Sequence, residues 1–274
     1  MIDAHVHIWR LGRNDCVWPT PDLGAIHRDH ELADIALRAR RVGVSSAILV
    51  QSQESERDTR WLLEIAKGSS FVAGVVGWAD LSAADIGGRL DALVRAGPLV
   101  GIRPMTEGCG DDWFDMPAID AGLAAMVERG LTFDALIRPR HLASLDRLAA
   151  RHPALAIMID HAAKPSIGVD REAWRDALAP LAARPNVHCK LSGLMTELAP
   201  GGSADALLPY VEDLLALFGP DRLVWGSDWP VLNLRGSYEA WLACACAAVP
   251  SADHQAVFDG NARRFYGLSQ PGAE

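Results

Sequence analysis

Residues 2–7 read Ile2-Asp-Ala-His-Val-His7, a short run in which apolar and polar residues alternate. Alternation with a period of two is typical of a β-strand, whose successive side chains point to opposite faces. Asp3, His5 and His7 are therefore predicted to share one face of a strand. Two imidazoles spaced in this way lie about 6–7 Å apart along the strand and can converge on one metal ion or one substrate oxygen.

The same type of unit recurs along the whole chain, because short apolar or β-branched runs alternate with stretches that have helical spacing. Strands are predicted at residues 2–7, 44–51, 71–78, 98–103, 131–137, 154–160, 187–191 and 222–227. Helices are predicted at residues 31–42, 56–68, 83–96, 117–129, 140–151, 171–183, 204–218 and 237–248. Eight strands, each followed by a helix, favour parallel pairing through right-handed crossovers.

We therefore expect one α/β domain over residues 1–274, a (β/α)₈ TIM barrel with its active site at the C-terminal ends of the strands. A doubly wound open sheet is the alternative. Residues 253–268 are predicted to form an extra C-terminal helix packed on the outside. Residues 10–30 form a long insertion after the first strand, which we expect to cover the mouth of the barrel.

The composition limits the classes of partner. The formal net charge of −9 disfavours nucleic-acid binding, which needs a basic face. The sequence predicts neither a signal peptide nor a membrane span. Five cysteines, without the spacing of a zinc or redox motif, suit free thiols in the cytoplasm. The expected partner is a small molecule, and the oligomeric state is left open.

Two further residues are predicted to join His5 and His7. His161 ends the sixth predicted strand and Asp228 follows the eighth. In a closed barrel the eighth strand neighbours the first, so Asp228 is expected to face the two histidines. Three histidines and one aspartate at strand C-termini combine a general base with an electrophilic site.

Other polar or aromatic residues near predicted strand ends are expected to contact the substrate. An arginine there can grip a carboxylate or a carbonyl oxygen, and a lysine inside the barrel must pair with an acid or touch the substrate. An indole can form an apolar wall of the site. The predicted contacts are Arg103, Lys190, Gln51, Arg138, Trp229 and Lys164, with Trp78 and Trp225 as further candidates for the wall.

Several of these residues lie in segments that resemble the signatures of a known family. The segments are Asp3-Ala-His-Val-His7, Asp160-His-Ala-Ala-Lys-Pro165, Cys189-Lys-Leu-Ser-Gly193 and Gly226-Ser-Asp-Trp-Pro230. They resemble the amidohydrolase superfamily, and within it the sugar-lactonase and 2-pyrone-4,6-dicarboxylate hydrolase branch that includes L-fuconolactonases. The resemblance covers nearly the whole chain. It implies a barrel, a hydrolytic water and cleavage of a cyclic ester.

The chain departs from the binuclear members of that superfamily. Those members carry a bridging lysine or glutamate after strand four and a histidine after strand five. Here strand four ends in Arg103, and residues 133–138 contain no histidine. The resemblance therefore implies either no metal or one divalent ion, with zinc favoured. His5, His7 and Asp228 are the candidate ligands, with His161 as a further one.

The predicted reaction opens a sugar-acid lactone of the L-fucono- or L-rhamnono-lactone type. Asp228 would activate a water, and His161, His5, His7 or an ion would stabilise the oxyanion. A 2-pyrone-4,6-dicarboxylate-type hydrolase, a lactone isomerase and a metal-dependent decarboxylase remain alternatives. A non-catalytic barrel that binds a sugar acid is the alternative from another class.

Overall fold

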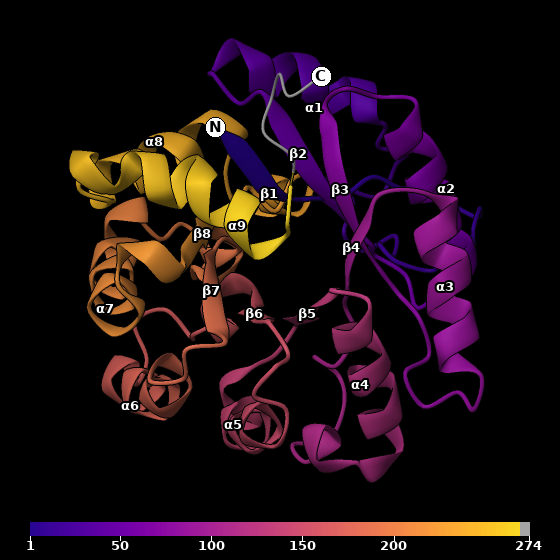
Figure 1. The fold of residues 1–274 in the computed structure, drawn as a ribbon. Helices are drawn as coiled ribbons and strands as arrows, with labels where there is room; N and C mark the ends of the chain where they lie inside the picture. Colours follow the sequence, from indigo (N-terminus) through magenta and orange to yellow (C-terminus); the bar gives the residue numbers. More distant parts are fainter. Residues whose placement is uncertain (269–274) are drawn as a thin grey trace.

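The computed structural model describes residues 1–268 and contains one sheet of eight parallel strands, in the order β1 to β8 (Figure 1). The strands are β1 (Ile2–Val6), β2 (Ser46–Val50), β3 (Val72–Gly77), β4 (Leu99–Ile102), β5 (Thr132–Ala135), β6 (Ile157–Ile159), β7 (Val187–Leu191) and β8 (Leu223–Trp225). Each lies within a predicted strand. The last six residues of the expected domain, 269–274, are outside the described part.

The sheet closes where the segment after β8 pairs with the end of β1. The backbone N–H of Asp228 donates to the carbonyl of His5 at 2.9 Å, and that of His7 donates to the carbonyl of Trp229 at 2.7 Å. A parallel bridge also joins Val6 to Trp229. The (β/α)₈ TIM barrel is confirmed, and the open sheet is excluded.

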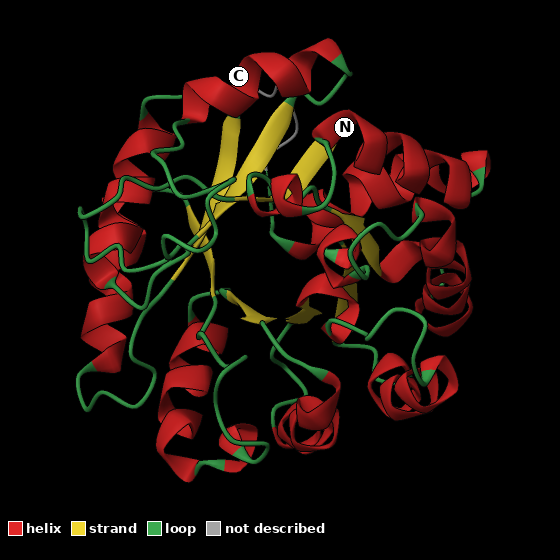
Figure 2. Cartoon of the chain, turned by 180° about the vertical axis from the view of Figure 1, so that it is seen from behind, coloured by secondary structure: helices red, strands yellow, loops and turns green. Residues whose placement is uncertain are grey.

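Helices cover the outside of the strands, and they form a ring around them in Figure 2. The helices are α1 (Leu32–Arg41), α2 (Glu56–Lys67), α3 (Ile86–Ala96), α4 (Asp120–Glu128), α5 (Leu142–Arg151), α6 (Arg171–Ala182), α7 (Leu208–Phe218) and α8 (Tyr238–Ala248). All eight helices were predicted, but the first residues of the ranges predicted for α4, α5 and α7 form 3₁₀ turns. Their apolar faces pack with the outward side chains of the strands in one large core. Within residues 1–268, no helix combines the length and apolar character needed to cross a bilayer.

The first strand does not keep the strict alternation that its sequence suggests. A register shift lies between Asp3 and Val6. Ile2 and Ala4 face the barrel interior, whereas Asp3 accepts a hydrogen bond from the hydroxyl of Tyr238 on α8 at 3.0 Å. The prediction that Asp3 shares a face with His5 is therefore wrong, because the irregularity turns the strand between them.

The C-terminal segment contacts both the outside and the bottom of the barrel. It consists of a π-helical turn (Ala256–Gly260) followed by α9 (Asn261–Phe265). Ala262 and Tyr266 pack in the same cluster as Ile2, at the end of the barrel where the strands begin (Figure 1). The segment therefore has two contacts: Val257 and Phe258 join the core on the outside of the strands, and its end closes the bottom of the barrel.

Candidate active site

The ends of the strands opposite α9 surround a cavity of about 570 Å³. Large cavities at this end are where TIM barrels place their active sites. Its walls come from strand ends and from the loops that follow them. The residues that line it are His7, Trp18, Ser52, Arg103, Met105, Glu107, Gly108, Leu136, Arg138, His161, Lys164, Asp228 and Val231.

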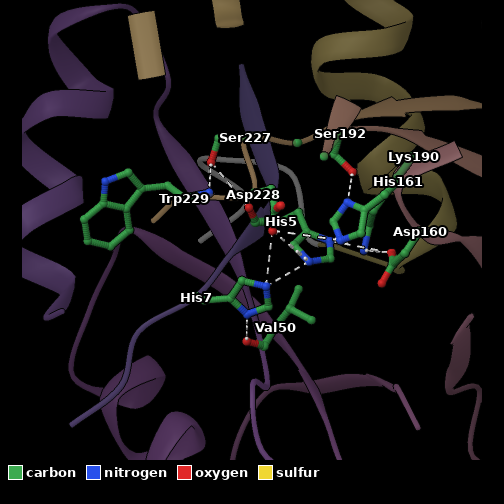
Figure 3. Close-up of polar contacts among 12 residues, drawn as sticks. His5, His7, Val50, Asp160, His161, Lys190, Ser192, Ser227, Asp228 and Trp229 are labelled. Carbon is green, nitrogen blue, oxygen red and sulfur yellow. Dashed lines mark hydrogen bonds and ion pairs between the residues drawn. The ribbon is translucent and has the colours of Figure 1, made fainter. Parts of the chain in front are cut away.

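The four predicted catalytic side chains come together at this cavity: His7, His161 and Asp228 line it, and His5 is fully buried beside them (Figure 3). Oδ1 of Asp228 lies 3.4 Å from Nε2 of His7, 3.9 Å from Nε2 of His5 and 3.9 Å from Nε2 of His161. All four residues are at most 3 % exposed. The prediction that barrel closure brings Asp228 against the histidines agrees with this geometry.

Hydrogen bonding assigns the tautomers of two histidines. Nδ1 of His7 lies 2.7 Å from the carbonyl of Val50, which can only accept, so Nδ1 carries the proton. Nε2 of His5 lies 3.3 Å from Nη1 of Arg103, which can only donate. The two Nε2 lone pairs therefore face each other at 3.1 Å, beside the carboxylate of Asp228. Such a convergence of lone pairs favours a cation between them.

This donor set fits a single divalent ion. Nitrogen ligands of tetrahedral zinc lie about 3.3 Å from one another, given bonds of about 2.0–2.1 Å. The three distances among Nε2 of His5, Nε2 of His7 and Oδ1 of Asp228 are 3.1, 3.4 and 3.9 Å. His161 also fits, because ligand atoms of His5, His161 and Asp228 all lie within 4.8 Å of one another.

Burial and mutual contact set the charges of the four side chains. Burial lowers the pKa of His7, lowers that of His161 to about 4, and lowers that of His5 well below its usual value. Burial alone would raise the pKa of Asp228, but His161 and His7 hold it well below the ordinary range. At neutral pH the site thus holds neutral imidazoles around an ionised carboxylate.

An unusual backbone turn aims His161 at the site. His161, Ala162, Ala163 and Lys164 all have positive φ, between 50° and 60°. A left-handed conformation costs about 1–2 kcal/mol for a residue with a side chain, so packing must hold it. The indole of Trp174 donates to the carbonyl of Ala162 at 2.9 Å.

The segment after β7 supports the His161 ring from the other side. The hydroxyl of Ser192 lies 2.9 Å from Nδ1 of His161. A Cβ on Gly193 would lie only 2.5 Å from Cγ and Nδ1 of the same ring, and Gly193 has a φ of +66°. Only glycine satisfies both constraints at this position.

The structure separates the six predicted substrate contacts into two groups. Arg103, Arg138 and Lys164 line the cavity, whereas Gln51, Lys190 and Trp229 are not among its lining residues and are at most 2 % exposed.

The second group has other partners. Gln51 donates to the carbonyl of Arg103 at 2.7 Å. Lys190 is bound between Asp134 and Asp160, at 2.6 and 2.9 Å. The prediction that Gln51 and Lys190 contact the substrate is therefore wrong; both side chains bind other residues of the protein. The same correction applies to Trp229, whose side chain points away from the catalytic cluster in Figure 3.

The apolar wall and its partners come from loops that sequence periodicity did not identify. Trp18, from the insertion at residues 10–30, lines the cavity, whereas Trp225 is fully buried in the core. Glu107 was also missed: its carboxylate lies 2.6 Å from both Nζ of Lys164 and Nη2 of Arg138. One feature of the sequence indicated such a residue: Arg138 and Lys164 both lie near predicted strand ends, and two cations at one site need an acidic partner.

With zinc as the probe for a divalent ion, we expect Gly193→Ala to weaken binding about 10- to 100-fold, because the added methyl group displaces the His161 ring. Competition with a chromophoric chelator measures this affinity. Gly201→Ala is the matched control, since Gly201 also has a positive φ (+76°) but nothing lies within 4 Å of the added Cβ. Equal zinc affinities in the two variants would contradict the role of Gly193.

The buried histidines predict a loss of stability in acid. The pKa of His161 is about 4 in the folded protein against 6.5 for an exposed histidine, so protons bind the unfolded chain first. The free energy of unfolding should therefore fall between about pH 6.5 and pH 4, by about 3 kcal/mol for His161 alone. Urea unfolding of chelator-treated protein measures it. His161→Gln should flatten this pH dependence, and an unchanged slope would argue against the assignment.

Comparisons with known proteins place the chain in a family. An amidohydrolase family model matches residues 2–268. An L-fucono-1,5-lactonase from Burkholderia ambifaria is 45 % identical, over 100 % of this chain and 97 % of the relative. Another L-fucono-1,5-lactonase, from Burkholderia multivorans, is 35 % identical over 98 % and 97 % of the two chains.

A solved structure gives the same result. A zinc-bound amidohydrolase from Burkholderia multivorans is 32 % identical and superposes with a TM-score of 0.91, over 98 % of this chain and 99 % of the other. Family model, relatives and structure agree over nearly the whole length. The chain therefore belongs to the amidohydrolase family, as its motifs predicted.

Proposed function

We propose that the protein hydrolyses a sugar-acid 1,5-lactone, with L-fucono-1,5-lactone as the first substrate to test. The observation that carries the proposal is the Asp228 carboxylate, surrounded by three imidazoles at the floor of the cavity. The two L-fucono-1,5-lactonases among its relatives support the choice of substrate.

Asp228 is the proposed general base. It takes a proton from water while the water oxygen bonds to the lactone carbonyl carbon. The Arg103 guanidinium, which lines the cavity, is the proposed hydrogen-bond donor to the carbonyl oxygen as this oxygen becomes negative. The ring C–O bond then breaks, and the proton returns to the leaving oxygen through His161, whose Nε2 lies 3.9 Å from Asp228. The product is an open hydroxy acid.

A divalent ion, which we propose to be zinc, would be held by His5, His7 and Asp228, with His161 available as a further ligand, and would supply Lewis-acid polarisation. The zinc-bound relative supports this choice. We further propose that the protein acts in the cytoplasm, since its five cysteines are all free in the structure.

The charges around the cavity favour a neutral substrate. Arg103 pairs with Asp160 at 3.3 Å, and Arg138 and Lys164 pair with Glu107. A dicarboxylated pyrone would have to compete with these internal carboxylates for each cation. A sugar lactone needs only hydrogen bonds, which paired cations still donate. Arg103, Arg138, Lys164 and Trp18 are the proposed substrate contacts.

We expect Asp228→Asn to lower kcat for L-fucono-1,5-lactone by about 10²- to 10⁴-fold while the protein stays folded, because the amide cannot accept the proton. A pH-indicator assay of acid release measures this, with circular dichroism as the check on folding. Asp80→Asn, which changes an exposed aspartate after β3, is the control. Near-normal turnover by Asp228→Asn would remove this residue from the mechanism. A folded wild-type protein that binds aldonic acids but opens no lactone would instead be a sugar-acid binder.

We expect Glu107→Gln to strengthen inhibition by dicarboxylates about tenfold, because Lys164 loses its charged partner and Arg138 keeps only Glu197, at 3.2 Å. Inhibition constants against the neutral lactone measure the effect. Glu128→Gln, on the exposed end of α4, should leave them unchanged. If wild-type protein hydrolysed a pyrone dicarboxylate faster than any sugar lactone, the assignment of a neutral substrate would be wrong.

A further inference from the structure

A chain of buried charged groups runs through the interior of the barrel below the site. Asp134 on β5 and Lys190 on β7 are both fully buried. Nζ of Lys190 lies 2.6 Å from Oδ2 of Asp134 and 2.9 Å from Oδ1 of Asp160. Thr132 donates from its hydroxyl to Oδ1 of Asp134 at 3.3 Å. Most other side chains of the barrel interior are apolar: Ile2, Ala4, Ile48, Val50, Val76, Met158 and Val224.

Stability alone gives no reason for these charges. Removing ions from water costs several kcal/mol for each group, and replacing a buried ion pair by apolar residues is often neutral or stabilising. Other barrel interiors are filled with branched aliphatic side chains, as most of this one is. If the charges serve a function, one end of the chain should contact residues that take part in it.

The upper end of the chain reaches the catalytic cluster. Asp160 follows β6, and its Oδ2 lies 3.3 Å from Nη1 of Arg103. Its Oδ1 lies 3.5 Å from Nδ1 of His5 (Figure 3). Nδ1 of His5 has no other hydrogen-bond partner, whereas Oδ1 of Asp160 is also the atom that lies 2.9 Å from Nζ of Lys190. The place of the Asp160 carboxylate thus determines where the proton of His5 is held and how Arg103 is oriented.

The lower end of the chain is formed by the C-terminal segment. The hydroxyl of Tyr266, just after α9, donates to Oδ2 of Asp134 at 2.7 Å. The Tyr266 ring lies 5.6 Å from Nζ of Lys190. The segment that closes the bottom of the barrel therefore contacts the same charges that reach the site.

We propose that Tyr266, Asp134 and Lys190 are positioning residues that hold Asp160, and through it His5 and Arg103, in the geometry needed for catalysis. The inference rests on the site assigned in the proposed function. It makes the C-terminal segment a part of the catalytic apparatus, although the segment lies at the opposite end of the barrel from the cavity.

Tyr266→Phe tests the proposal, because it removes one hydroxyl and keeps the ring. We expect kcat for L-fucono-1,5-lactone to fall about 10- to 100-fold, with KM changed less than about twofold. Tyr210→Phe is the matched control. Its hydroxyl is also buried and accepts from the N–H of Gly168 at 2.8 Å, but it lies between the outer helix α7 and a loop. A purely structural role for Tyr266 would lower the melting temperature and leave kcat as in Tyr210→Phe.

A second measurement needs neither substrate nor metal. Long-range proton–nitrogen NMR of chelator-treated, histidine-labelled protein reports which ring nitrogen of His5 carries the proton, with the signal assigned from His5→Gln. We expect Tyr266→Phe and Asp134→Asn to shift the His5 ring signals, and Tyr210→Phe to leave them in place. Unshifted His5 signals in the first two variants would overturn the proposal, even if the wild-type protein hydrolysed no lactone. If Tyr266→Phe does not fold, Asp134→Asn decides in its place by the same criterion.

Discussion

Closure of the barrel is the constraint on which the site depends. The backbone of Asp228 bonds to the carbonyl of His5, and the N–H of His7 bonds to the carbonyl of Trp229. These two bonds join the end of the sheet to its beginning, and they also set the carboxylate beside both imidazoles. Asp228 has a φ of 60°, which turns the chain out of the strand direction at this point. Fold and site therefore share one set of hydrogen bonds, so a change that opened the barrel would also separate the catalytic groups.

Much of this arrangement could be predicted from the sequence, because parallel strands bring their C-terminal ends to one edge. His7, His161 and Asp228 each follow a strand and line the cavity, and His5, near the end of β1, is buried against them. The periodic pattern also located all eight strands and the helices between them. These features depend on the spacing of residues along single elements, which a sequence displays directly.

The features that could not be predicted depend on irregular backbone or on loops. A register shift in β1 sends Asp3 toward α8, although strict alternation places it with His5. Glu107 and Trp18 lie in loops without any period, so their place at the cavity follows only from tertiary structure. Tyr266 lies in a segment whose sequence is typical of an outer helix, yet its hydroxyl donates to Asp134 inside the barrel. Contacts between residues of different elements cannot be predicted from the pattern within each element alone.

The pairing of charges also bears on how a lactonase would release its product. A sugar lactone is neutral, whereas the acid formed from it is an anion at neutral pH. Because Glu107 already occupies Lys164 and Arg138, the new carboxylate meets no unpaired cation on these side chains. Asp228 remains ionised beside it, and the whole chain carries a formal charge of −9. Like charges in a cavity of low dielectric repel strongly, so hydrolysis itself would weaken the binding of the ligand. The same ion pairs that suit a neutral substrate would therefore favour departure of the anionic product.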